Sequence, residues 1–192
     1  MRPGGDPVTR IVAGAFKGRR LGTPAGQATR PTSDRVREAL FGALGDLTGA
    51  RFADLYAGSG AVGLEAASRG AAHVLLVEND PRAGRVIRDN IALLRAGDVV
   101  KLAPSRVDSV LLGGPGTGGR YDVVFADPPY ESAEDEVAAV LGDLVAHGWL
   151  AADALVVVER STRSPEPGWV KGITGERSRR YGETMLWYGR AS

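Results

Sequence analysis

Three glycines in the stretch DLYAGSGAVG, residues 54–63, have the spacing of a loop that binds a cofactor. Gly58, Gly60 and Gly63 form the pattern GxGxxG. In this pattern the first glycine permits a sharp turn, the second lets the backbone approach a ligand, and the third lets the next helix pack closely. Glu78 stands twenty residues after Gly58, where a carboxylate can accept hydrogen bonds from both hydroxyls of a ribose. The spacing therefore predicts an adenosine cofactor, and it fits NAD and S-adenosylmethionine equally.

Asp54, at the head of the same stretch, favours one of these two cofactors. At the mouth of the predicted strand, its carboxylate would repel a pyrophosphate and attract an ammonium group. The methionine part of S-adenosylmethionine carries such an ammonium, so Asp54 favours it over NAD. The alternative without a ligand is a glycine turn in which Glu78 caps the helix that begins at Pro81.

A second group of residues, Asp127, Pro128, Pro129 and Tyr130, follows a predicted strand seventy residues later. Each proline fixes φ and lacks an N–H group, so this loop is stiff and presents hydrogen-bond acceptors. Acceptors aimed at one point suit the exocyclic amine of a base, which Tyr130 could hold by stacking. The loop therefore predicts methylation of an amino group, in which catalysis is mainly positioning and electrostatics. The alternative is a proline-rich loop with Tyr130 packed in the core.

Alternating strand and helix signals predict the scaffold that positions both loops. Short apolar segments rich in β-branched residues are typical of strands buried on both faces. A strand, helix, strand order indicates an α/β fold with a mostly parallel sheet and helices on both faces. The predicted strands are 52–57, 73–78, 99–103, 121–126 and 154–159, and the predicted helices are 62–69, 82–95, 105–112 and 134–147.

The two ends of the chain depart from this alternation. Residues 10–21 predict a basic β-hairpin, followed by a helix capped by Thr32 or Ser33 whose apolar positions run from Val36 to Leu47. After Trp169 the pattern predicts a hairpin at one sheet edge, made of WVKGITGE, a basic turn and TMLWYGR. The segment GGPGTGG, residues 113–119, predicts a flexible surface loop.

Charge is divided unevenly along the 192 residues, although the total is only +1. Residues 1–37 carry +6, residues 38–159 carry −9, and residues 160–192 carry +4. Two basic ends around an acidic middle favour contact with a polyanion through the ends. Solvated arginines on a small domain are the alternative.

The composition also excludes several classes of chemistry. With no cysteine, the chain has no disulfide, no thiolate metal site and no thiol nucleophile, which disfavours covalent methylation at carbon 5 of cytosine. His73 and His147 lack the spacing of metal ligands, so no metal is expected. No segment predicts a signal peptide or a membrane span, so we expect a cytoplasmic protein. No spare apolar patch argues against a monomer, so we expect a monomer. Three tryptophans, Trp149, Trp169 and Trp187, are expected to pack in the core.

Five motifs occur in one order: RIVAGAFKGRRL, RPTSDRVREALFGAL, DLYAGSGAVGLEAASRGA, VEND and ADPPY. Together they resemble the RsmD family of bacterial 16S rRNA methyltransferases over residues 10–130, and the tail RRYGETMLWY is compatible. The resemblance implies a seven-stranded, Rossmann-like, class I S-adenosylmethionine-dependent domain at residues 32–192, with a basic hairpin extension at residues 1–31. It implies methylation of the 2-amino group of guanine 966 in 16S rRNA, on an assembled or nearly assembled small ribosomal subunit.

The resemblance also assigns candidate site residues. Asp127, Pro128, Pro129 and Tyr130 would receive a flipped guanine. Many methyltransferases place an acidic residue after the third strand for the adenine amino group, whereas this chain has Ser105 and Arg106 there. The candidate cofactor residues are Thr32, Asp54, Tyr56, Ala57, Gly58, Ser59, Gly60, Glu78, Asn79, Ser105 and Arg106. The candidate RNA-binding residues are Arg10, Lys17, Arg19, Arg20, Arg30 and Arg35, with Arg30 and Thr32 open to either role.

Three other functions fit parts of the sequence. A DNA amino-methyltransferase remains open, because the DPPY loop indicates an amine on a base but not the nucleic acid that carries it. A non-catalytic RNA-binding assembly factor with a vestigial pocket is a second alternative. A small NAD-dependent reductase would need a proton donor such as a Tyr/Lys pair, and none stands out.

Overall fold

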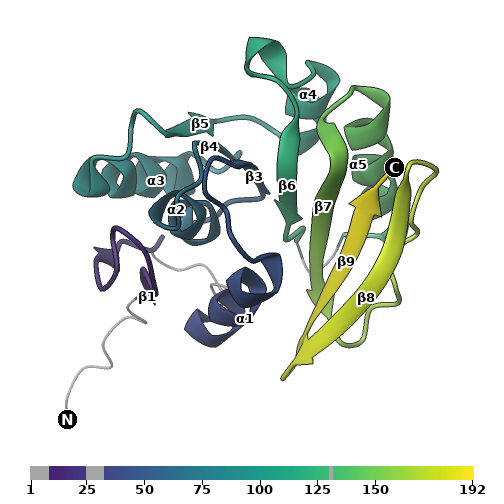
Figure 1. Cartoon of the computed structure of the whole chain (residues 1–192), viewed down its shortest axis with the longest axis horizontal. Coiled ribbons are helices and arrows are strands. Elements are labelled where there is room, and N and C mark those ends of the chain that lie inside the picture. The colour runs from purple at the N-terminus through teal and green to yellow at the C-terminus, as the bar shows by residue number, and fades with distance from the viewer. Residues whose placement is uncertain (1–8, 25–32, 130–131) are drawn as a thin grey trace.

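The sheet at the centre of the molecule has seven strands in the order β5-β4-β3-β6-β7-β9-β8. The computed structural model describes residues 9–24, 33–129 and 132–192. The first five strands of this order are parallel, whereas β9 runs antiparallel to both β7 and β8 (Figure 1). This topology confirms the α/β fold that the alternating pattern predicts.

The element bounds agree closely with the sequence pattern. The strands are β1 (Thr9–Arg10), β2 (Arg20–Leu21), β3 (Arg51–Leu55), β4 (His73–Val77), β5 (Val100–Ala103), β6 (Tyr121–Ala126), β7 (Leu150–Ser161), β8 (Ile173–Tyr181) and β9 (Thr184–Ala191). The helices are α1 (Asp34–Leu44), α2 (Ala61–Ser68), α3 (Pro81–Leu94), α4 (Val107–Leu112), the short 3-10 helix η1 (Gly116–Gly118) and α5 (Glu134–Ala146).

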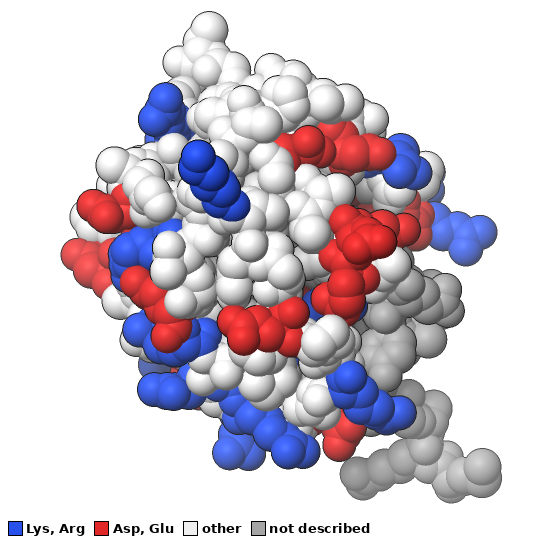
Figure 2. All heavy atoms as spheres, turned by 90° about the vertical axis from the view of Figure 1, so that its right-hand side faces the viewer, with Lys and Arg blue, Asp and Glu red and all other residues white. Residues whose placement is uncertain are grey.

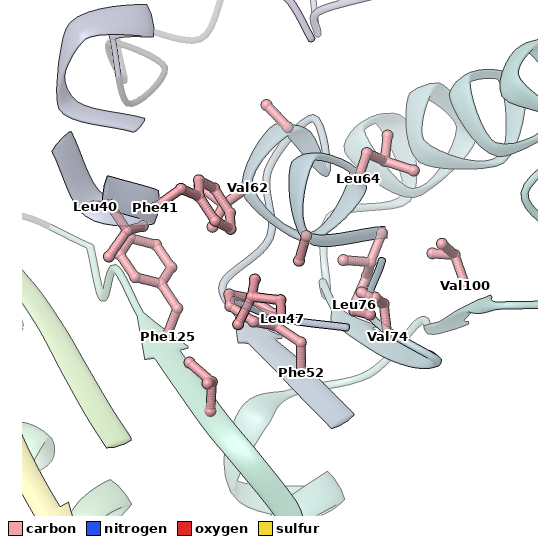
Figure 3. Close-up of a cluster of buried hydrophobic side chains, with 14 of the residues drawn as sticks. Leu40, Phe41, Leu47, Phe52, Val62, Leu64, Val74, Leu76, Val100 and Phe125 are labelled. Atoms are coloured by element: carbon pink, nitrogen blue, oxygen red, sulfur yellow. The ribbon is translucent and has the colours of Figure 1, made fainter. Parts of the chain in front are cut away.

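The sheet separates two hydrophobic cores. Residues of α1, α2 and α3 pack on one face of the sheet, and residues of α4 and α5 pack on the other. Figure 3 shows Phe41 of α1 and Phe125 of β6 in the first core, and the rings of Phe41 and Phe52 stack with their centroids 6.1 Å apart. Because alternate strand residues face opposite sides, Asp54 shares the face of α1 and α2 with Phe52.

Several predicted bounds are corrected by local backbone geometry. The strand predicted at 52–57 ends at Leu55, because Tyr56 adopts a positive φ of 66°. The strand predicted at 154–159 extends over Leu150–Ser161, with a register shift opposite Tyr121 and Val123 and a φ of 59° at Asp153. Helix α1 ends at Leu44, although Leu47 is still buried.

The C-terminal hairpin differs from the prediction in one respect. Arg177, Arg179 and Arg180 lie within β8 instead of forming a basic turn, because each has a pairing partner on β9. Gly182 and Glu183 make the turn. The arginines are therefore displayed along the edge strand of the sheet.

The N-terminal hairpin has only two paired residues on each strand, yet it is held firmly on α2. The buried carboxylate of Glu65 accepts hydrogen bonds from the backbone N–H groups of Val12 (2.8 Å) and Ala13 (2.9 Å). Ile11 and Leu21 of the hairpin are buried in the same core as α1 and α2. The described part of the hairpin is thus packed as one body with the sheet domain.

Candidate active site

The glycine loop joins β3 to α2 at the carboxyl edge of the sheet, as predicted. Tyr56, Gly58 and Gly60 all have positive φ, at 66°, 57° and 79°. Ala57 continues the β3–β4 pairing through its N–H bond to Val77 O (2.9 Å), and Gly60 N–H bonds Ala57 O (2.8 Å). Helix α2 therefore begins immediately after a tight, internally bonded turn.

Each of the three glycines meets a different environment. A Cβ at Gly63 would strike the Leu76 side chain, so the close packing of α2 on β4 is confirmed. A Cβ at Gly60 would lie 3.1 Å from Leu76 and 3.3 Å from Ile87, so a side chain here would press on the core. A Cβ at Gly58 would meet nothing within 4 Å. Of the three glycines, Gly58 is thus the one with open space where a side chain would stand.

Asp54 lies beneath the start of α2 and has an exposed fraction of only 1%. Its Oδ2 accepts the N–H of Gly63 at 2.9 Å, which satisfies one donor of the helix N-terminus. The pKa of Asp54 is raised to about 7, chiefly by burial, with a smaller contribution from the charges of Glu78 and Glu159, and the Gly63 hydrogen bond opposes this rise. Asp54 is thus a support of the loop from below, and an ammonium near it would favour its ionised form.

Glu78 links the end of β4 to the glycine loop. Its Oε2 accepts the Gly58 N–H at 2.8 Å, and its Oε1 accepts the Asp80 N–H at 2.8 Å. The side chain of Asp80, and not that of Glu78, caps α3, so the alternative in which Glu78 caps this helix is wrong. A carboxylate has about four acceptor positions, so two backbone bonds leave Glu78 able to accept ribose hydroxyls.

A cavity of about 400 Å³ opens beside Glu78, within the usual size range for small-molecule sites. The structure brings together several predicted residues in its wall from the ends of β3, β4, β5 and β6. The predicted residues in this wall are Tyr56, Glu78, Asn79, Ser105, Arg106 and Pro129.

The segment after β5 has a limited set of polar groups facing this cavity. Arg106 caps α4 only through its backbone, and its guanidinium binds Asp108, with Nη2 and Oδ2 2.8 Å apart. Ser105 lies beside it, partly exposed. Because Asp108 holds the Arg106 side chain, the Ser105 hydroxyl and the backbone are the groups available to an adenine edge.

The predicted catalytic loop begins directly after β6. Asp127 N–H bonds Leu55 O at 3.4 Å, which sets the loop beside the glycine loop. Asp127 is half-buried, Pro128 is buried and Pro129 is exposed. Tyr130 lies outside the described residues, as do the candidates Arg30 and Thr32.

Two neighbouring residues of β7 that sequence reasoning missed, Glu159 and Arg160, border this loop. Ala126 pairs with Val158, so Asp127 and Glu159 occupy the next position on adjacent parallel strands. Arg160 is buried, and its Nη2 donates to Ser132 O (3.0 Å) and Glu134 Oε1 (2.8 Å), which fixes the chain beyond the loop. Burial raises the pKa of Asp127 well above its usual range, Glu159 and Asp54 raise it further, and Arg160 lowers it.

Asn90 of α3 is another residue that the sequence analysis missed. This buried amide donates to Ser59 O (3.0 Å) and Gly22 O (3.0 Å), and it accepts the Gly22 N–H (2.8 Å). It therefore connects the glycine loop to the segment that follows the hairpin. A signal existed, because Asn90 is a polar residue in the buried stripe that also contains Ala83, Ile87 and Leu94.

All the candidates for RNA contact that the structure describes are exposed: Arg10, Lys17, Arg19, Arg20 and Arg35. Two of them also have structural contacts. Arg19 Nη2 donates to Leu93 O near the end of α3 at 3.0 Å, and Arg10 Nε lies 3.5 Å from Asp34 Oδ2. Among the described residues, the side chains of Lys17, Arg20 and Arg35 are exposed and make no hydrogen bond or ion pair.

The residues around the glycine loop suit an adenosine cofactor. Gly58 leaves space where a side chain would otherwise stand, Glu78 retains acceptor positions, and the adjoining cavity is large enough for an adenosine.

Within the described ranges no group of three or more His, Cys, Asp or Glu side chains could hold a metal ion, and no helix could span a membrane. The indole of Trp149 is buried and donates to Leu111 O at 2.8 Å, which confirms it as a core residue.

Comparison with known proteins agrees with this geometry. A family model described as "Conserved hypothetical protein 95" matches residues 9–190. Ribosomal RNA small subunit methyltransferase D of Escherichia coli (strain K12) is 38% identical over 165 residues, which are 85% of this chain and 80% of that protein. The chain belongs to the RsmD family of methyltransferases.

Two further comparisons extend the family assignment over nearly the whole chain. Ribosomal RNA small subunit methyltransferase D of Haemophilus influenzae is 33% identical over 164 residues, which are 85% of this RsmD-family chain and 84% of that protein. The solved structure of yhhF from Escherichia coli superposes with a TM-score of 0.83 at 32% identity, covering 97% of this chain and 99% of that one. The similarity therefore includes both the N-terminal hairpin and the β8–β9 edge.

Proposed function

We propose that this protein transfers a methyl group from S-adenosylmethionine to the exocyclic 2-amino group of a guanine in 16S rRNA. The guanine is the one that the family resemblance implies, position 966, and the substrate is the small ribosomal subunit in the cytoplasm. Membership of the RsmD family and the names of its relatives, rRNA small subunit methyltransferases, support this proposal.

The lining of the cavity gives the strongest support to this proposal. The cavity beside the glycine loop contains both Glu78, the candidate for the ribose, and Pro129 of the predicted catalytic loop. A donor held by the ends of β3 and β4 would therefore lie next to a base held after β6. Such placement is what direct transfer between two bound molecules requires.

The candidate cofactor residues have distinct tasks in this proposal. Gly58 and Ala57 would present the backbone, Glu78 and Asn79 would accept or donate at the ribose, and Ser105 would contact the adenine edge. S-adenosylmethionine supplies, when bound, an electrophilic methyl group on a positively charged sulfur. Asp54, buried beneath α2, would favour an ammonium without touching it directly.

The catalytic loop would act on the amine. Asp127 and the carbonyl of Pro128 would accept the two amino hydrogens, which directs the nitrogen lone pair away from the loop. The amine becomes acidic as its nitrogen gains a bond, so the ionised Asp127 carboxylate stabilises the charge that develops and can take the proton. Burial of Pro128 and the Arg160 contacts beyond the loop keep these acceptors in place.

The test is methyl transfer to small subunits purified from a strain that lacks this protein, followed by mapping of the modified nucleotide. We expect Asp127→Ala to lower the rate at least about a hundredfold, since it removes a transition-state acceptor. The affinity for S-adenosylhomocysteine, measured by calorimetry, should change less than about threefold. Asp135→Ala is the matched control, because it removes the same charge from an exposed position on α5.

Different results would overturn different parts of the proposal. A normal rate for the Asp127 variant would refute the proposed chemistry. Binding of NADH without S-adenosylhomocysteine would refute the cofactor, and methylation of duplex DNA but not of subunits would favour a DNA methyltransferase. Subunit binding without transfer by the wild-type protein would indicate an assembly factor.

A further inference from the structure

The β8–β9 hairpin reaches the same edge of the sheet as the candidate active site. Asp127 and Glu159 occupy adjacent positions, Glu159 pairs with Leu186 on β9, and Leu186 pairs with Arg179 on β8. Paired residues share a face of the sheet, and neighbouring strands lie about 4.8 Å apart. Three such spacings separate Asp127 from Arg179, so their backbones are about 14 Å apart. The remaining residues of the hairpin, up to its turn at Gly182, extend beyond this row.

Three exposed arginines gather around this turn, and we call Arg163, Arg179 and Arg180 the arginine tip. Arg163 belongs to it because the adjacent Thr162 N–H bonds Glu183 O in the turn at 2.9 Å. The Arg163 side chain is 78% exposed and lies 3.9 Å from Glu183 Oε2. Within the described structure, the side chain of Arg179 donates one hydrogen bond to Ser178 O, and that of Arg180 donates one to Gly182 O. A guanidinium has five donors, so most of this capacity faces solvent.

Other arginines of the same sheet edge have full structural roles. Arg190 binds Glu176 through two nitrogens and also donates to Asp153 O at 3.0 Å. Arg177 lies over the Tyr188 ring, 4.8 Å from its centroid, and reaches Ala43 O. The arginines with structural contacts are thus Arg177 of β8 and Arg190 of β9, which lie farther from the hairpin turn than Arg179 and Arg180.

The distribution of charge on this side of the molecule follows the same division. Figure 2 faces the β8 edge, and several of its Lys and Arg side chains lie along the lower margin, the level at which the β8–β9 turn lies in Figure 1, while others stand higher up. Asp and Glu lie mainly above this margin, on both sides of the face. A purely structural reason also exists, because charged residues on an edge strand prevent pairing with other chains. That reason explains β8 but not Arg163, which lies outside the edge strand.

We propose that the arginine tip binds phosphates of the RNA strand next to the methylated guanine. Resting on the proposed function, this assigns a second RNA contact on the side of the active site opposite the N-terminal hairpin. A base everted into a pocket leaves its flanking phosphates at the rim, and arginine forks suit phosphate oxygens. The arginine tip and the N-terminal hairpin together contact the RNA strand on both sides of the base.

The experiment compares a tip variant, Arg163→Gln/Arg179→Gln/Arg180→Gln, with a control, Arg88→Gln/Arg95→Gln/Arg120→Gln. The control removes three exposed arginines from α3, its C-terminal end and the amino end of β6. We measure the Kd for small subunits at several salt concentrations, the Kd for S-adenosylhomocysteine, and methyl transfer. The tip variant should bind subunits about tenfold more weakly, with a slope of log Kd against log salt reduced by about 2. Its S-adenosylhomocysteine affinity should match that of the wild type.

Other outcomes would overturn either the role of the arginine tip or the proposed function. Equal losses in the tip variant and the control would mean that net charge alone matters and would overturn the inference, as would wild-type binding by the tip variant. A wild-type protein that neither binds S-adenosylhomocysteine nor methylates subunits would refute the proposed function and the inference with it. If the triple variant aggregates, Arg163→Gln alone keeps the edge strand intact and must still weaken binding and lower the salt slope.

Discussion

At the scale of single residues, the neighbouring carboxylates Asp127 and Glu159 determine how activity should depend on pH. Burial, Glu159 and Asp54 raise the pKa of Asp127, so the folded protein favours its protonated form. An ionised Asp127 is the better acceptor for the amino hydrogens. The rate of methyl transfer should therefore increase with pH as Asp127 loses its proton, above the usual range of a carboxylic acid.

Replacing Glu159 by glutamine should move this rising limb to lower pH. Glu159→Gln removes one negative charge beside Asp127 and so lowers the Asp127 pKa. The measurement is the single-turnover rate across pH with saturating S-adenosylmethionine. Asp135→Asn, with the same change of charge on an exposed helix face, should leave the profile in place. A profile that moves to higher pH, or not at all, would show that Asp127 is not the group that titrates.

The sequence predicted which acidic residues stand at strand ends, but it did not predict how deeply they are buried. The acidic ends of β3, β4 and β6 were predicted from motifs, whereas Glu159, at the end of ALVVVE, has the same placement but no familiar motif around it. The burial of Asp54 beneath α2 also escaped prediction. Exposure depends on which helix covers a strand end, and a local pattern contains no information about that contact.

At the scale of elements, the packing of α2 on β4 can be tested through its glycine. A Cβ at Gly63 would overlap the Leu76 side chain in a closely packed layer, so Gly63→Ala should destabilise the protein by about 3 kcal/mol. Gly142, on α5, is the matched control, because a Cβ there meets nothing within 4 Å. Gly142→Ala should stabilise by about 0.5–1 kcal/mol through helix propensity. Urea unfolding of both variants measures the difference, and equal effects would contradict the packing described.

The elements themselves were largely predictable because each interior strand is short, apolar and bounded by a helix signal. The edges were less predictable, since edge strands lack that apolar pattern. Residues 177–180 consist of Arg, Ser, Arg and Arg, which indicate a turn by composition, yet they pair with residues 185–188 of β9. Pairing with the adjacent strand β9 overrode local preference there.

At the scale of the whole molecule, the N-terminal hairpin and the sheet domain meet at Gly14. Gly14 has a φ of 83°, and a Cβ there would strike the carbonyl of Ser68 on α2. Gly14→Ala should lift the hairpin from α2, destabilise the fold by about 3 kcal/mol and weaken binding to small subunits.

Gly18 provides the control for this prediction within the same hairpin. It has a similar φ of 81°, but a Cβ there would meet nothing within 4 Å. Gly18→Ala should therefore show only the backbone strain, about 1–2 kcal/mol, with subunit binding close to that of the wild type. Thermal unfolding and subunit binding by both variants separate strain from docking. Matching losses of affinity would show that contact with α2 does not position the hairpin.

The bonds from Glu65 to Val12 and Ala13 have a further consequence for the entropy of association. A disordered basic arm loses backbone freedom each time it binds, and this loss reduces its affinity. The described hairpin residues lose that freedom earlier, when the chain folds. An RNA backbone that meets Lys17 or Arg20 on this hairpin therefore encounters cations whose backbone is already fixed. The heat capacity change of that encounter should then be small, because no folding accompanies it.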